Sequence, residues 1–107
     1  MRTLLFNVTG QTIALDPNCD TEALIPGAKG CVEAEFTFTK EWDGCAKVVA
    51  FYSNLGREFE PQVLKDGKHC TIPKEALEKY IFKVKVFGKS PNYEICTNKL
   101  TLYQRGG

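Results

Sequence analysis

Hydrophobic and polar residues alternate along much of this chain, most regularly between residues 32 and 51. From 32 to 39 every second residue is apolar, and the residues between them are glutamate or threonine. A period of two predicts a β-strand with one buried face and one solvated face. A turn-prone stretch at 40–44 then carries the only tryptophan, and a second apolar run covers 46–52. We interpret the segment as two core strands joined by a short connection, with Phe36, Phe38 and Trp42 as the anchors of the fold.

Turn residues divide the rest of the chain into further short strands. Apolar runs at 3–8 and 11–15 flank Gly10, which predicts a tight hairpin because glycine readily accepts a positive φ. Pro61 lacks the amide hydrogen that a ladder needs, so its strand is expected at a sheet edge or with a bulge. The remaining strands are expected at 58–64, 69–72, 80–87 and 94–103.

One segment has a helical signature. Pro73 suits the first position of a helix, and glutamate near that end interacts favourably with the helix dipole. The pattern as a whole predicts an all-β protein, an antiparallel β-sandwich or small barrel of about seven or eight short strands with one short helical turn near 73–79. A length of 107 residues predicts a single domain, 1–107.

Composition is that of an ordinary globular protein and argues against two classes of partner. The chain is 43% hydrophobic and 25% charged, with a net charge of +1. It has no basic run, so we expect no nucleic-acid partner. Its apolar runs are far shorter than the roughly 20 residues of a membrane span, and its first residues lack the apolar core of a secretion signal. We expect a protein that is made and kept in the cytoplasm or released by lysis.

The residues that usually carry chemistry are not arranged as a catalytic or metal site. His69 and Cys70 are neighbours on a predicted strand, so their side chains point to opposite faces and cannot pair as base and nucleophile. Glu33 and Glu35 share a strand face, an arrangement typical of a solvated surface rather than of a glycosidase cleft. The five cysteines lack zinc-site spacing and are expected mostly to fill the core. We predict no enzyme activity, no metal and no cofactor.

Two stretches are candidates for contact with other proteins. The first strand has apolar residues at three consecutive positions, Leu4, Leu5 and Phe6, so its outer side either meets a neighbouring subunit or is buried within the domain. The second stretch is the long connection 16–30, which contains Leu24 and Ile25. Connections of this length commonly carry interactions, although a plain crossover between two sheets explains it equally well.

Exposed aromatic side chains would support a different function. β-Sandwich modules bind sugars through aromatic residues on a sheet face, and the candidates here are Trp42, Tyr52, Tyr93 and Tyr103. The competing interpretation places Trp42 in the core and the tyrosines at the rim with solvated hydroxyl groups. The sequence favours the second interpretation and leaves the first open.

Several short motifs follow one another in a characteristic order. They occupy 6–11, 34–44, 47–51, 70–77, 83–88 and 97–98, and their centre is a Phe-x-Phe strand followed by Glu-Trp-Asp-Gly. This order resembles the small β-rich virion structural proteins of phages and prophages of Gram-positive bacteria, including N-terminal domains of baseplate or tail-fibre proteins and head or tail accessory proteins. The resemblance supplies no catalytic residues.

The resemblance implies a virion structural or accessory protein of the tail, baseplate or capsid decoration type. Such a protein would be made in the bacterial host cytoplasm and would act through contacts with other virion proteins in a homo-oligomeric assembly. The alternative is a carbohydrate- or host-surface-binding module that recognises a host glycan. A third interpretation is a small inhibitor of a host enzyme.

Overall fold

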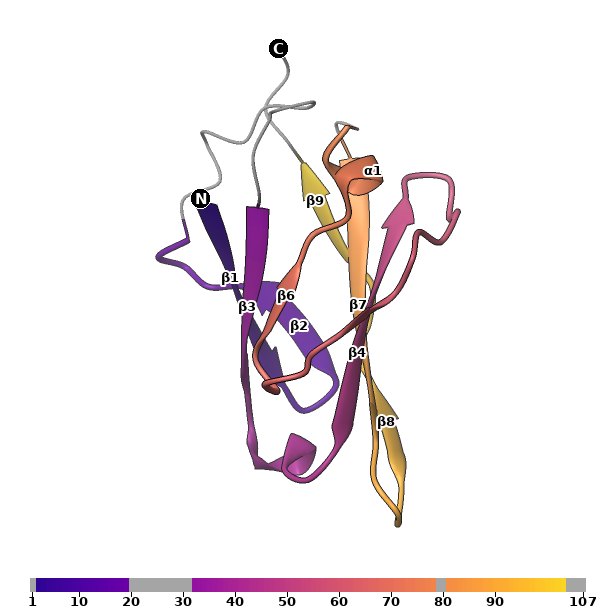
Figure 1. The fold of residues 1–107 in the computed structure, drawn as a ribbon. Coiled ribbons are helices and arrows are strands. Elements are labelled where there is room, and N and C mark those ends of the chain that lie inside the picture. The colour runs from indigo at the N-terminus through magenta and orange to yellow at the C-terminus, as the bar shows by residue number, and fades with distance from the viewer. Residues whose placement is uncertain (1, 20–31, 79–80, 104–107) are drawn as a thin grey trace.

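The computed structural model describes residues 2–19, 32–78 and 81–103, which form two β-sheets that share one core (Figure 1). Sheet A contains β1 (Arg2–Thr9), β2 (Thr12–Leu15), β3 (Val32–Phe38) and β6 (His69–Thr71). Sheet B contains β4 (Ala46–Ser53), β5 (Gln62–Val63), β7 (Ile81–Lys89), β8 (Glu94–Cys96) and β9 (Leu100–Tyr103). A 3-10 turn, η1 (Lys40–Trp42), joins β3 to β4, and α1 (Lys74–Leu77) follows β6. The predicted β-sandwich with one short helical turn is confirmed.

Sheet A is mixed, which corrects the prediction of a purely antiparallel sandwich. Its strand order is β2-β1-β3-β6. β1 pairs antiparallel with β2 but parallel with β3, from Arg2 opposite Val32 to Val8 opposite Phe38. Parallel pairing needs the chain to return between the two strands, and β2 makes this return because it runs antiparallel along β1 toward the end where β1 and β3 begin. Alternation assigns each strand a face but carries no information on strand order, so the sequence did not reveal this pairing.

Sheet B is antiparallel and is built on the long pair β4–β7. The predicted strand 94–103 is two strands, because β8 pairs with β7 at residues 87–89 and β9 pairs with it at 81–84. Thr97 lies between them, buried, and its Oγ1 accepts a 3.0 Å hydrogen bond from the Val86 amide. The predicted strand 58–64 is shorter in the structure, because regular pairing resumes only after Pro61, in the edge strand β5.

The alternating apolar residues of both sheets meet in the core. The largest fully buried side chains are Trp42, Phe6, Phe36, Phe51, Phe82, Leu4, Ile13, Ile72, Val8, Val49, Val84 and Val86. Burying a side chain of this size contributes about 1.5–3 kcal/mol to the free energy of folding. The face assigned from the sequence to β3 is therefore the buried face in the structure, and β7 shows the same alternation of buried and less buried residues.

Trp42 closes one end of the sandwich, where η1 joins the two sheets. Its indole is fully buried, and Nε1 donates a 2.7 Å hydrogen bond to the carbonyl oxygen of Gly10 in the β1–β2 turn. The indole also packs on the ring of Phe38, with 5.2 Å between centroids. A row of aromatic rings continues from there through Phe36 to Phe6. The three predicted anchors thus form one row, in which Phe38 lies between Phe36 and Trp42 and is less buried than either.

The indole also lies close to β7 at Gly88. A Cβ atom built on Gly88 would lie 2.6 Å from the Trp42 ring, well inside van der Waals contact. Glycine is therefore required here by close approach.

Replacing Gly88 with alanine is expected to destabilise the protein by about 1–3 kcal/mol, because the added methyl group displaces a fully buried indole. Urea unfolding followed by tryptophan fluorescence measures the loss, and the native emission should shift to the red as Trp42 gains solvent. Thr37→Ala, on the exposed face of β3, is the control and should change stability by no more than about 0.5 kcal/mol. Unchanged stability and emission for Gly88→Ala would show that Trp42 does not depend on this contact.

Candidate functional site

The outward-facing residues of sheet A form an acidic surface. Cross-strand register places Leu5, Glu35 and His69 opposite one another on β1, β3 and β6. They alternate with buried neighbours, so their side chains point away from the core. We call this surface the acidic face and define it as Leu5, Asn7, Asp16, Glu33, Glu35, Asp66 and His69.

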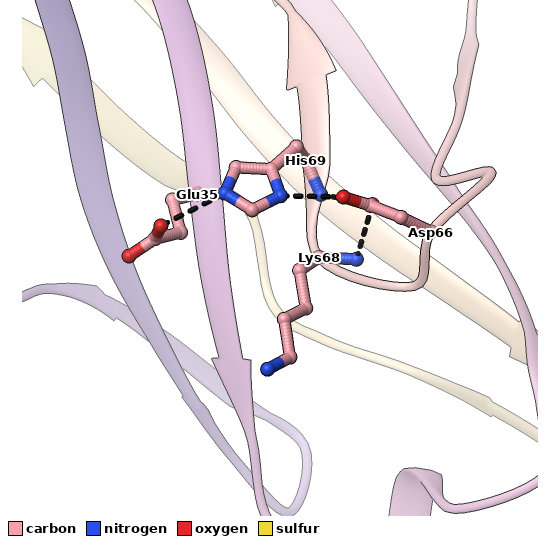
Figure 2. Close-up of polar contacts among 4 residues, drawn as sticks. All are labelled: Glu35, Asp66, Lys68 and His69. Carbon is pink, nitrogen blue, oxygen red and sulfur yellow. Dashed lines mark hydrogen bonds and ion pairs between the residues drawn. The ribbon is translucent and has the colours of Figure 1, made fainter.

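His69 joins two carboxylates of the acidic face. Its Nδ1 lies 2.6 Å from Oδ2 of Asp66, and its Nε2 lies 2.8 Å from Oε1 of Glu35 (Figure 2). A neutral imidazole carries only one N–H, so both contacts are hydrogen bonds only when the ring is protonated and donates from both nitrogens. The bonds to Asp66 and then to Glu35 raise the pKa of His69 above its ordinary value of 6.5.

The turn between β5 and β6 positions Asp66. Its Oδ1 accepts hydrogen bonds of 2.9 Å and 2.7 Å from the backbone amides of Lys68 and His69. Gly67 provides the positive φ of 79° that the turn requires. These backbone bonds, and then the bond to His69, hold the pKa of the Asp66 carboxyl well below its usual range. The cluster therefore attaches the turn and the edge strand β6 to β3.

The cluster has an acid–base group but no nucleophile beside it. Cys70 follows His69 on β6 with its side chain buried on the opposite face, as the sequence predicted. Burial, followed by the charges of Glu33 and Asp66, raises the pKa of the Cys70 thiol to about 12, so it stays protonated and unreactive at neutral pH. Within 2–19, 32–78 and 81–103, no three His, Cys, Asp or Glu side chains gather in a way that could hold a metal ion. The arrangement is suited to fixing charge and strand position rather than to bond making.

The structure separates the predicted interface residues into three groups. Leu4 and Phe6 are fully buried in the core, because odd and even positions of β1 point to opposite faces. Leu5 lies half-buried on the acidic face, and is the member of this trio that a partner could contact. Leu24 and Ile25 lie outside the described residues.

The aromatic residues considered for sugar binding do not gather on one surface. Trp42 is fully buried, and Tyr52 is only 9% exposed. Tyr103 lies opposite Ile81 at one end of β7, and Tyr93 follows the loop at the other end, past Lys89. Eight residues of strand correspond to about 27 Å, so these two exposed rings do not form a common platform.

Sequence reasoning placed His69 on a strand surface but did not find its two partners. Asp66 was recognisable, because an Asp-Gly turn three residues before a histidine places a carboxylate near the ring. Glu35 was not recognisable, because it lies 34 residues away and meets His69 only through the β3–β6 register.

Comparisons with known proteins bear on the fold. No family model matches the chain, and no curated protein matches it. Among solved structures, the N-terminal domain of phage TP901-1 ORF48 matches with a TM-score of 0.52 and 13% sequence identity, over 99% of this chain and 98% of that chain. The chain has the fold of this phage domain. The resemblance to phage proteins drawn from the sequence motifs is confirmed at the level of the fold.

The helices in the described part of the chain are too short for a transmembrane span.

The His69 cluster makes stability depend on pH. Because the folded-state pKa of His69 is raised, its stabilising contribution is complete below the ordinary value of 6.5 and is lost as the pH rises through the folded-state value. His69→Gln is therefore expected to reduce the free energy of unfolding at about pH 5.5 and to have much less effect at about pH 9. Urea unfolding of both proteins at the two pH values measures the difference.

A matched variant tests whether the carboxylates cause this pH dependence. Glu35→Gln removes one of the two charges that face His69 and should shrink the difference between the two pH values. Glu94→Gln, in an exposed pair with Lys89 far along the sequence, should leave it unchanged. An equal loss of stability at both pH values for His69→Gln would contradict a role for the charged ring.

Proposed function

We propose that this chain is a phage virion structural or accessory protein, of the tail, baseplate or capsid decoration type, that acts through contacts with other virion proteins. The observation that carries the proposal is the likeness to the N-terminal domain of phage TP901-1 ORF48 across nearly the full length of both chains. The match covers 99% of this chain and 98% of the phage domain, so neither chain carries a large insertion that could hold a separate active site. We propose that residues 1–107 act as one domain, which the shared core of the two sheets supports.

The surfaces of the sandwich support a role in protein–protein contact. On the outer side of sheet B lie Val63, which is 58% exposed, and Phe87, which is 38% exposed. The acidic face lies on the outer side of sheet A. Two broad sheet faces with fixed side chains are suited to repeated docking in an assembly. The described residues offer no nucleophile activated by a base, which favours binding over catalysis.

The glycan-binding alternative has no comparable support. Its strongest candidate, Trp42, is buried and hydrogen-bonded to Gly10, and the exposed tyrosines lie far apart. We therefore propose protein contacts, made in the virion after synthesis in the bacterial cytoplasm, as the function.

Purified particles provide the direct test. Particles induced from the strain that encodes this chain are banded on a density gradient, and each fraction is analysed by quantitative mass spectrometry. The chain should co-sediment with the major capsid protein at a fixed stoichiometry and remain with it after a second gradient. Recovery of the chain only from the soluble lysate, with none in the particle band, would contradict a virion role.

A further inference from the structure

An apolar row crosses the outer side of sheet B. The strand register places Val63, Val48, Phe87 and Cys96 opposite one another on β5, β4, β7 and β8. Val63 is 58% exposed and Phe87 is 38% exposed, while Val48 and Cys96 are half-buried. Four neighbouring apolar side chains on an outward sheet face are more than scattered surface hydrophobics and indicate a contact surface.

Lysine side chains flank this row. Lys83 and Lys85 point outward from β7, between the buried residues of the same strand. The Lys85 ammonium lies 5.0 Å from the centre of the Phe87 ring, and that of Lys99 lies 4.3 Å from the centre of the Tyr52 ring. Among the described residues, none of these three lysines forms an ion pair with a carboxylate. We call this surface the basic face, defined as Val48, Tyr52, Val63, Lys83, Lys85, Phe87, Cys96 and Lys99.

Carboxylates on the same side of sheet B are few. Glu58 pairs with Tyr52 in an isolated antiparallel bridge, so one carboxylate lies at the edge of the basic face. Glu94 lies at the tip of the β7–β8 hairpin, where it is paired with Lys89 at 3.7 Å. The centre of the face is therefore apolar and positively charged.

The acidic face on the other side of the sandwich has the complementary pattern. Leu5 is its central apolar side chain, and the carboxylates around it come from Asp16, Glu33, Glu35 and Asp66. His69 compensates Glu35 and Asp66 in part, whereas Glu33 has no ion-pair partner among the described residues. One side of the molecule thus presents apolar residues among carboxylates, and the other presents apolar residues among lysines.

We propose that the basic face of one copy of this chain docks on the acidic face of a second copy. The inference rests on the proposed function, since it names a second copy as the partner in the assembly. Because the two faces lie on opposite sides of the sandwich, the contact is head to tail, and it builds a ring when the rotation closes and a filament when it does not. Opposite charges steer the approach and set the register, and the apolar row against Leu5 is the dehydrated centre.

Sedimentation velocity of the purified chain tests the contact. In about 50 mM salt the wild-type chain should associate reversibly as its concentration approaches about 100 µM, and in about 500 mM salt it should dissociate, because salt screens the charges. A chain that stays monomeric at low salt and high concentration would overturn the proposal and would assign the basic face to a different partner.

Charge reversal on each face separates a head-to-tail contact from a symmetric one. The double variant Lys83→Glu and Lys85→Glu changes only the basic face, and Glu33→Lys changes only the acidic face. Each should weaken self-association at least tenfold, and an equimolar mixture of the two should form a one-to-one pair, because each supplies the face that the other lacks. Loss of association in only one of the two variants would indicate a symmetric interface and overturn the proposal.

Two controls complete the design. The double variant Lys40→Glu and Lys74→Glu changes the net charge as much as the Lys83→Glu and Lys85→Glu double variant does. Its exposed positions on η1 and α1 lie away from both faces, so it should associate like the wild type. Circular dichroism and thermal unfolding verify that every variant is folded, which the outward orientation of the changed side chains leads us to expect. If the chain is monomeric but is found in particles, the self-association is contradicted and the proposed function stands. If the chain associates but is absent from particles, the proposed function is contradicted.

Discussion

The contact of Trp42 with both sheets is the constraint on which the rest of the sandwich depends. Its indole nitrogen donates to the Gly10 carbonyl oxygen in sheet A, and its ring lies on Gly88 in sheet B. The hydrogen bond fixes the direction of the indole, and the ring approaches Gly88 so closely that a Cβ atom there would not fit, so Trp42 ties the two sheets together at this end. The apolar faces that meet behind this junction follow from the alternation within each strand, as in β3 and β7.

Once the inner faces meet, the outer faces acquire different characters. On sheet A the carboxylates surround Leu5 and are held in part by His69, whose two ring nitrogens both face acid groups. On sheet B, Lys85 and Lys99 lie over aromatic rings rather than beside carboxylates. The near-neutral net charge of +1 conceals this separation, because the opposite charges lie on opposite sides of the sandwich. A virion component that docks through fixed surfaces would use such polarity for orientation as well as for affinity.

Local features of the structure were the most predictable from the sequence. The Gly10 hairpin, the alternation of β3 and β7, the helical turn after Pro73 and the edge position of β5 each follow from a few neighbouring residues. The pairing partners were less predictable. The parallel β1–β3 pair and the division of the last strand at Thr97 depend on hydrogen bonds between distant segments, which no local pattern records. The candidate site has the same limit, since Asp66 is close to His69 in sequence but Glu35 is not.

The sequence by itself determined which side is apolar in the strands that alternate regularly, such as β3 and β7, because the period of two is a property of the backbone. It also determined that Trp42, the only tryptophan, stands between two core strands, and that Cys70 and His69 cannot act together. Only the tertiary structure decided that Leu4 and Phe6 belong to the core while Leu5 faces outward, that Glu35 meets His69, and that lysines and carboxylates gather on opposite faces. These outcomes depend on strand order and register, which arise from the packing of the whole chain rather than from any one segment.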